Sequence, residues 1–394
     1  MSQPQATGGR DFYRGAGRRF ETLGWKLRSY FTPSHIITYW RLARGNGITS
    51  VDASRKLVCF DFTDVEIDRE TGRYVFILAR DFEAAGCLPC FRAHFRFLAT
   101  MRHKHHKRLL LDRPFRVYGS ARELPVSAVA VTLSDHDDPE PATGCHIRVR
   151  YDYRWPEKAG EIAMPYFAFP EVYDYMIASA PPDPMASRPW RVFFAGCCEE
   201  ARYGSSVLPE KFGKMNRVQI IKALHERVGA DRIRHIASAA DLAVPTGEVS
   251  QFVWAGAFER GGYRIPHERW IESMDRAEFF LACPGVEMPL CHNVIEALAR
   301  GAVPILEHPE YFQPSLEHNE NCLVFRGSDE LVRMVERAFQ MPGPEIQRLR
   351  VAAAKYYASH LAPGVFARRL LNLPSSRVEL LLNAVRAPRE NAKS

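Results

Sequence analysis

The sequence predicts an α/β fold with two Rossmann-like domains, each a parallel sheet flanked by helices. Its 394 residues exceed one ordinary hydrophobic core and suit two domains of roughly 150 to 200 residues. Apolar runs of strand length alternate with helix-length segments in both halves, as in βαβ units. A proline-rich stretch separates the two halves. These three observations together favour two α/β domains over one large one.

Composition and charge are those of a globular protein, with 46% hydrophobic and 25% charged residues. The net charge of +7 suits a partner that carries phosphate, but it is too small to indicate a nucleic acid. The nine cysteines are scattered through apolar runs, which indicates free thiols in a reducing compartment. No signal peptide and no continuous apolar run of membrane-spanning length is present. We therefore expect a cytoplasmic protein.

The first predicted element is an amphipathic helix within residues 11–44. Phe20, Leu23, Leu27 and Tyr30 recur at helical spacing with basic residues between them. Such a helix either packs on its own domain or docks peripherally at the inner face of a membrane. Both alternatives stay open from the sequence.

The remainder of the first half, residues 56–153, predicts four strands and one helix. Apolar, β-branched and aromatic residues predict strands, and one longer segment predicts a helix. The predicted strands are Lys56–Phe62, Tyr74–Ala79, Val126–Leu133 and Ile147–Tyr153, and the predicted helix is Phe82–Met101.

The proline-rich stretch Ala180–Pro189 predicts an interdomain linker, because it is stiff and poor in apolar residues. We accordingly predict a first domain over residues 1–183 and a second domain over residues 184–365. Residues 366–394 are expected to form a basic helical tail.

The second half alternates regularly between strand and helix. The predicted strands are Trp190–Ala195, Arg232–Ala237, Phe279–Cys283, Val303–Leu306 and Cys322–Phe325. The predicted helices are Asn216–Val228, His267–Arg276, Pro289–Arg300 and Asp329–Phe339. Ligands of such a sheet bind at the carboxyl ends of its strands.

The segment Phe279–His308 carries the most specific pattern. A strand turns through Gly285 into a helix on which His292 and Glu296, four residues apart, share one face near the strand ends. A carboxylate there can accept hydrogen bonds from both hydroxyls of a ribose. The amides and the positive dipole end of the helix favour a diphosphate. This combination predicts a nucleotide-sugar pocket.

The run Glu296-Ala-Leu-Ala-Arg-Gly-Ala-Val-Pro304 resembles the donor-domain signature of GT-B glycosyltransferases. The preceding Cys283-Pro-Gly and Cys291-His292-Asn293 are similar to the exostosin-like branch of that family. The resemblance implies two domains facing a cleft, with Glu296 holding the donor ribose. Members of the branch commonly have arginine at the position of Asn293, so here another residue must neutralise the phosphates. Glu287 and Glu296 are nine apart, unlike the eight-residue spacing of retaining members, and the stereochemistry stays open.

Candidate phosphate ligands follow the first strand of the second half. Gly196 permits close backbone approach at the strand end, and Arg202 can pair with a diphosphate in a bidentate manner. Arg217, at the start of the next helix, is a second candidate cation.

The acceptor hydroxyl of an inverting transferase needs a proton acceptor, which the GT-B resemblance places in the first domain. Asp135 and His136 follow a predicted strand and have the required chemistry, and Asp81 is the runner-up. Asp135-His136-Asp137 also matches the metal-binding triplet of GT-A transferases, which is the rival interpretation. A third alternative is a non-catalytic sugar- or nucleotide-binding protein of the same fold.

The resulting hypothesis is metal-independent transfer of a sugar from a nucleotide-sugar donor to a saccharide or glycolipid acceptor. The resemblance points to cell-surface polysaccharide or lipopolysaccharide synthesis. No cofactor, no metal and no nucleic acid partner is expected. Cys87-Leu-Pro-Cys90 is interpreted as buried thiols, and His103, His105 and His106 as part of a basic surface.

Overall fold

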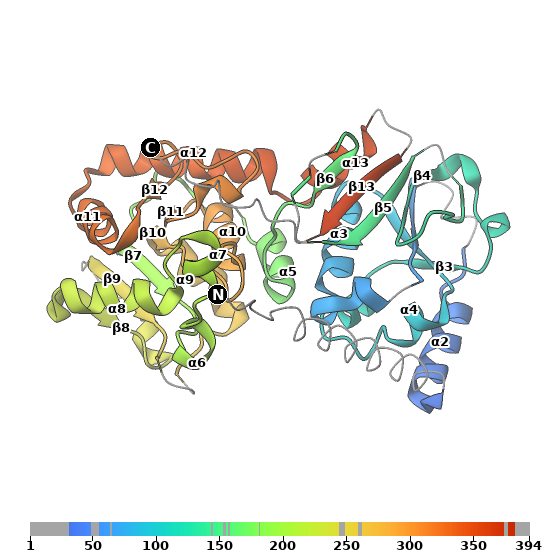
Figure 1. Ribbon diagram of the computed structural model, residues 1–394, viewed down its shortest axis with the longest axis horizontal. Helices are drawn as coiled ribbons and strands as arrows, with labels where there is room; N and C mark the ends of the chain where they lie inside the picture. Colours follow the sequence, from blue (N-terminus) through green and yellow to red (C-terminus); the bar gives the residue numbers. More distant parts are fainter. Residues whose placement is uncertain are drawn as a thin grey trace, which may run out of the picture. The chain divides into compact units, whose positions relative to one another are not determined.

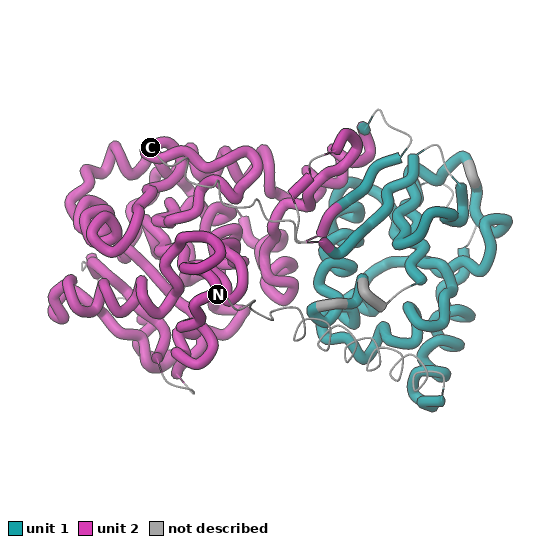
Figure 2. The backbone as a smooth tube through the Cα atoms, in the orientation of Figure 1, with its two compact units in different colours: residues 1–151, 373–380 teal, residues 152–372, 381–394 magenta. Residues whose placement is uncertain are grey.

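The computed structural model describes residues 31–48, 55–63, 65–142, 145–152, 155–156, 158–180, 182–243, 249–258, 262–373 and 377–382. It divides the chain into two compact units: unit 1 comprises residues 1–151 and 373–380, and unit 2 comprises residues 152–372 and 381–394 (Figure 2). The predicted helix over residues 11–44 lies partly outside the described residues, which include only its end as α2 (Pro33–Gly45). The end of the predicted basic tail, residues 383–394, also lies outside them.

Unit 1 contains a sheet whose first five strands are parallel, in the order β3-β2-β1-β4-β5 (Figure 1). The strands of unit 1 are β1 (Leu57–Asp61), β2 (Leu88–Arg92), β3 (Arg116–Tyr118), β4 (Val129–Ser134) and β5 (His146–Tyr151). The same sheet includes β13 (Arg377–Leu382), of which residues 377–380 belong to unit 1, and β6 (Glu161–Ala163), which belongs to unit 2. The helices of unit 1 are α2, α3 (Arg73–Ala84) and α4 (Phe95–Ala99).

Unit 2 contains a six-stranded sheet in the order β12-β11-β10-β7-β9-β8, and every pair of neighbours is parallel. Its strands are β7 (Trp190–Ala195), β8 (Ile233–His235), β9 (Ser250–Ala255), β10 (Ala277–Leu281), β11 (Val303–Leu306) and β12 (Leu323–Val324). Its helices are α5 (Pro170–Ala178), α6 (Glu200–Tyr203), α7 (Val207–Phe212), α8 (Arg217–Arg227), α9 (His267–Asp275), α10 (His292–Ala299), α11 (Gly327–Gln340), α12 (Gly343–His360) and α13 (Val365–Leu371). The predicted α/β class with parallel sheets and flanking helices is confirmed.

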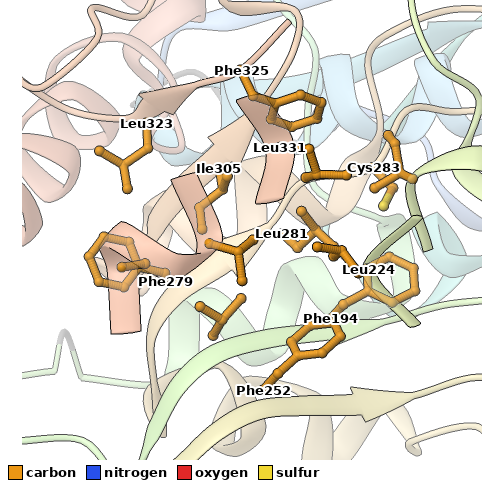
Figure 3. Packing of buried hydrophobic residues seen from close by; sticks show 14 of the residues in the cluster. Phe194, Leu224, Phe252, Phe279, Leu281, Cys283, Ile305, Leu323, Phe325 and Leu331 are labelled. Carbon is orange, nitrogen blue, oxygen red and sulfur yellow. The ribbon is translucent and has the colours of Figure 1, made fainter. Parts of the chain in front are cut away.

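The core of unit 2 explains why this sheet carries helices on both faces. Phe194, Phe252, Phe279 and Leu281 from the strands pack with residues of α8 and α11 such as Leu224 (Figure 3). On the other face, Phe193 of β7 contacts Trp270 of α9, with ring centroids 6.1 Å apart. Because both faces are buried, the strands are apolar throughout, as expected for a parallel sheet. The chain reverses its direction of strand addition between β7 and β10, which is where such sheets bind ligands.

Two predictions for the first half are wrong. Tyr74–Ala79 is part of helix α3, which is buried along most of its length, and a buried helix cannot be distinguished from a buried strand by its pattern alone. The predicted helix Phe82–Met101 instead contains the end of α3, strand β2 and helix α4. Gly86 interrupts it with φ +87°, a conformation that favours glycine after a helix.

The division between the compact units differs from the predicted boundary at residue 183. Residues 152–183 belong to unit 2, where Arg300 donates hydrogen bonds to the carbonyls of Ser179 and Ala180. Arg350 of α12 similarly donates to the carbonyls of Asp183 and Ala186. Hydrogen bonds from two buried arginines therefore hold the proline-rich stretch against unit 2.

Other boundaries differ in detail. Helix α10 begins at His292 instead of Pro289, because residues 285–288 form a turn in which the Gly285 N–H donates to the Met288 carbonyl. The predicted helical tail includes a strand, β13, next to β5 in the first sheet. None of the helices in the described part is long and apolar enough to cross a bilayer.

Candidate functional site

A cavity of roughly 480 Å³ opens in unit 2, within the size range of small-molecule sites. It lies at the carboxyl ends of β7 and β9 and at the first turn of α10. Its charged and polar lining residues include Glu199, Arg202, Tyr203, Arg217, Tyr263, Arg264, His267, His292, Asn293 and Glu296. The cavity therefore lies at the position where the sequence predicts ligand binding in the second domain.

Arg217 is the deepest cation of this cavity, with only 4% of its surface exposed. Its guanidinium donates to the Pro284 carbonyl at 3.2 and 2.9 Å and to the Cys197 carbonyl at 3.0 Å. It also lies 4.0 Å from the ring centroid of Tyr203. Among the described residues no carboxylate pairs with it. A buried charge without a counterion is costly, so this cation favours an anion in the cavity.

Two neighbours fix the position of Arg217. Asn216 caps α8 by accepting from the Gln219 N–H, while the Gln219 side chain accepts from the Asn216 N–H. Gly196 leaves the space that the guanidinium occupies, since a Cβ there would lie 3.2 Å from Arg217 Nη1. The glycine predicted for close backbone approach thus makes room for the predicted arginine.

Glu296 is 2% exposed and lines the same cavity. Its carboxylate accepts from the Phe169 N–H at 2.8 Å and from Trp270 Nε1 at 2.7 Å. Burial raises the pKa of Glu296 to about 7, although both hydrogen bonds act in the opposite direction. Each oxygen has one protein donor and keeps a second lone pair, so the carboxylate can still accept from a ligand. Glu296 also has a structural role, because it holds the start of α5.

The first turn of α10 faces the cavity through Cys291, His292 and Asn293. His292 is held by a contact of 2.7 Å between its Nδ1 and the Phe167 carbonyl, and by rings of the same segment. Asn293 donates to the carbonyl of Ala195, the last residue of β7, at 3.0 Å. The first amides of a helix have no partners within the helix and carry its positive dipole end. This turn is chemically suited to an anion.

The rim of the cavity is more solvated. Arg202 and Arg264 are exposed, and Arg202 makes no salt bridge with any described residue. With Arg217 they supply three cations against the carboxylates of Glu199 and Glu296. A diphosphate carried by a group with hydroxyls matches this set, since cations and helix amides bind its phosphates and Glu296 accepts from the hydroxyls.

Gly285 is the one predicted donor-site residue that does not line the cavity. A Cβ at this position would lie 3.0 Å from the carbonyls of Met288 and Leu290. The absence of a side chain at Gly285 therefore permits the tight turn before α10. The preceding residue, Pro284, accepts a hydrogen bond from Arg217 through its carbonyl.

The predicted proton acceptors lie in unit 1. Asp135 follows β4 and accepts from the N–H and hydroxyl of Thr63. His136 Nε2 lies 3.4 Å from Asp61 Oδ2. Asp81 is buried within α3, so the reason for choosing it, a position after a strand, was wrong. Asp137 pairs with Arg148 and Arg377, which separates the two carboxylates of the GT-A-like triplet.

The sequence analysis missed Trp270, Phe169 and Tyr203, which support Glu296 and Arg217. It also missed strand β9, although its apolar run Phe-Val-Trp-Ala before Gly256 is a signal for a buried strand. Trp270 and Phe169 could not be found in this way, because their role depends on contacts 26 and 127 residues apart in the chain.

Within the described residues, no set of three histidine, cysteine or carboxylate ligands converges in this cavity. The nine cysteines, including the two that line it, are free thiols. The cavity's chemistry rests on arginine, amide and carboxylate groups.

No protein-family model and no curated protein matches the chain. Solved structures that resemble it include an α-glucosyltransferase with UDP and a 13-mer DNA containing an HMU base, at 10% identity and TM-score 0.37 over 80% of this chain and 98% of that chain. HepE from Anabaena with UDP matches at 12% identity and TM-score 0.34, over 81% and 100%. A glycosyltransferase from Rickettsia africae ESF-5 matches at 10% and 0.42, over 80% and 97%. These similarities are too distant to assign an activity to this chain.

Proposed function

We propose that this chain is a GT-B-type glycosyltransferase whose unit 2 binds a nucleotide-sugar donor in the cavity beneath α10. The observation that carries the proposal is the buried guanidinium of Arg217, which has no carboxylate partner among the described residues and lies in the same cavity as Glu296. An anion would compensate Arg217, and a ribose would use the remaining lone pairs of Glu296. The motif around Glu296 that resembles the exostosin-like branch agrees with this assignment.

The chemistry expected of this arrangement is stabilisation of a leaving group. As the bond from the anomeric carbon to the diphosphate breaks, negative charge grows on the diphosphate oxygens. Arg217, Arg202 and the first turn of α10 would stabilise that charge without reorganising. This scheme needs no metal in the cavity, so the nucleoside diphosphate should bind equally well in the presence of EDTA.

The acceptor proposed is a saccharide or glycolipid of cell-surface polysaccharide or lipopolysaccharide synthesis, which rests on the family resemblance. Asp135, His136 and Asp81 stay predictions as proton acceptors.

Peripheral membrane contact is proposed for helix α2. Ile37 and Trp40 are 65% and 51% exposed, and Arg44 lies over the Trp40 ring at 4.9 Å. Exposed apolar and aromatic residues beside arginines suit the interface of an anionic bilayer. Sedimentation with vesicles containing anionic lipid should pull down the parent chain and less of the Trp40→Ala variant. Equal sedimentation of both chains would show that Trp40 of α2 does not contribute to membrane binding, which would contradict the proposal for this helix.

The donor site is tested by calorimetric titration with UDP, GDP and dTDP. Arg217→Lys keeps the charge but cannot reproduce the fork of hydrogen bonds, and a charged hydrogen bond contributes about 1.5–3 kcal/mol. We expect affinity for the preferred nucleotide to fall by roughly 10- to 100-fold. Arg227→Lys is the matched control, because it lies on the same helix and pairs with the exposed Asp329.

Circular dichroism checks that both chains are folded. If the folded parent and Arg217→Lys then bind the nucleotide with equal affinity, the diphosphate does not bind at Arg217. Hydrolysis of the corresponding nucleotide-sugar then tests the enzyme. Binding without any hydrolysis or transfer across an acceptor panel would instead support the non-catalytic alternative.

A further inference from the structure

A second polar cluster lies in unit 1 and shares no residue with the donor cavity. Strands β2, β1 and β4 are parallel neighbours, so their carboxyl ends meet at one edge of the sheet. Asp61 ends β1, His94 follows β2 by two residues, and His136 follows β4 by two residues. The topology thus brings together two imidazoles and a carboxylate that are far apart in the sequence.

The geometry of these three side chains is that of converging ligands. His94 Nε2 lies 2.6 Å from Asp61 Oδ1, and His136 Nε2 lies 3.4 Å from Asp61 Oδ2. One ligand atom from each residue lies within 4.8 Å of the other two. Ligand atoms about 2.0–2.2 Å from a tetrahedral Zn²⁺ lie about 3.3 Å from one another. Small side-chain adjustments would therefore let all three contact one ion.

His136 supplies an independent observation. Its Nε2 is buried and has no hydrogen-bond partner in the described part of the chain. A buried polar atom left unsatisfied costs about 1–3 kcal/mol. Coordination of a cation would satisfy this nitrogen.

The local charge also favours a cation. Asp61 and Glu140 flank a single arginine, Arg92, which pairs with both of them. Asp135 adds a further carboxylate at Thr63, two residues beyond Asp61. Arg92 and the Glu140 N–H bind Oδ2, whereas Oδ1 has His94 as its partner.

We propose that Asp61, His94 and His136 form a binding site for a divalent transition metal ion. Two imidazole nitrogens and one carboxylate are the ligands of Zn²⁺ and related ions in open sites, where other positions are left for water or substrate oxygens. Once ligated through Nε2, His136 is no longer available as the proton acceptor that the sequence suggested.

The test is metal binding by the full chain after treatment with EDTA and removal of the chelator. Zn²⁺ is titrated in competition with a colorimetric chelator, and Co²⁺ is followed by its visible absorption, which reports nitrogen and oxygen ligation. We expect one ion per chain, and a loss of at least 100-fold in affinity in both His94→Gln and His136→Gln. His360→Gln, which removes an imidazole in unit 2, should bind as the parent does.

His136→Gln keeps the test interpretable, because the ring nitrogen that it removes makes no hydrogen bond with a described residue. Its melting temperature without metal should equal that of the parent, and only the parent should be stabilised by Zn²⁺. Absence of a 1:1 complex with Kd below about 10 μM, or equal binding by His136→Gln and the parent, overturns the proposal. Either result leaves the cluster as a hydrogen-bonded ion pair. Because metal binding is the readout, neither result depends on the donor site.

Discussion

Glu296 in unit 2 and Asp61 in unit 1 are both buried carboxylates beside the carboxyl ends of a parallel sheet, yet their pKa values shift in opposite directions. Glu296 accepts from two neutral donors, Phe169 N–H and Trp270, and burial raises its pKa to about 7. Asp61 accepts from His94, Arg92 and the Glu140 N–H, and its pKa falls to about 2. At Asp61 the hydrogen bonds from His94, the Glu140 N–H and Arg92 outweigh burial and lower the pKa, whereas the two hydrogen bonds to Glu296 do not outweigh its burial.

The same contrast extends to the ligands that each cluster suits. The cavity of unit 2 contains a buried cation, Arg217, without a carboxylate partner among the described residues. The cluster of unit 1 contains more carboxylates than guanidinium groups around Asp61. One therefore suits an anion such as a diphosphate, and the other a metal cation.

The largest expected effect comes from removing Asp61. Asp61→Ala removes the buried carboxylate that accepts from Arg92, His94 and the Glu140 N–H, and a hydrogen bond to a charged group contributes about 1.5–3 kcal/mol, so we expect a loss of about 3–5 kcal/mol. Urea unfolding of the metal-free chain, monitored by circular dichroism, measures this loss in the free energy of unfolding. Asp137→Ala is the matched control, since Asp137 is half exposed and pairs with Arg148 at the surface, where a pair contributes about 0–1 kcal/mol. A loss below about 1 kcal/mol in Asp61→Ala would contradict the ion-pair account.

Glu296 should make stability depend on pH in the opposite sense to Asp61. Its folded pKa of about 7 exceeds the ordinary value of 4.5, so the folded state holds the proton more tightly. The resulting stabilisation is complete below pH 4.5 and disappears as the pH rises through 7. The free energy of unfolding therefore includes a contribution from Glu296 that falls by on the order of 3 kcal/mol between these two pH limits.

Glu296→Gln removes this titration. Unfolding free energies of the parent and the variant, measured between pH 4 and 8, should therefore diverge, with the parent losing more stability toward pH 8. Glu287→Gln, an exposed neighbour, should follow the parent. Parallel profiles for the parent and Glu296→Gln would contradict the raised pKa of Glu296.

The smallest effect is expected at the cavity rim. Arg202→Ala removes an exposed cation and should weaken nucleotide binding by less than about tenfold, corresponding to about 1 kcal/mol or less. Stability should change by no more than about 0.5 kcal/mol. Titration at two salt concentrations checks this prediction, because screening should reduce the contribution of Arg202 more than that of the buried Arg217. If Arg202→Ala loses as much nucleotide affinity as Arg217→Lys, the main contact with the anion is at the rim and not at Arg217.

The parts of the fold that the sequence predicted are those whose signals are local. Strands β7 and β11 and the face shared by His292 and Glu296 follow from short apolar runs and helical spacing. The start of helix α3 was misassigned because Tyr74–Ala79 is a continuous buried apolar run of strand length. The partners of Glu296 and Asp61 could not be predicted, since Phe169 is 127 residues from Glu296 and His94 is 33 residues from Asp61. Such contacts depend on which strands become neighbours in the sheet.

The central claim is that one cavity in unit 2 holds a nucleoside diphosphate between Arg217 and Glu296. A crystal structure of the chain with its preferred nucleoside diphosphate tests it most directly. We expect phosphate oxygens within hydrogen-bond distance of Arg217 or the first turn of α10, and ribose hydroxyls donating to Glu296. A nucleotide bound elsewhere, with Glu296 contacting only Phe169 and Trp270, would contradict it.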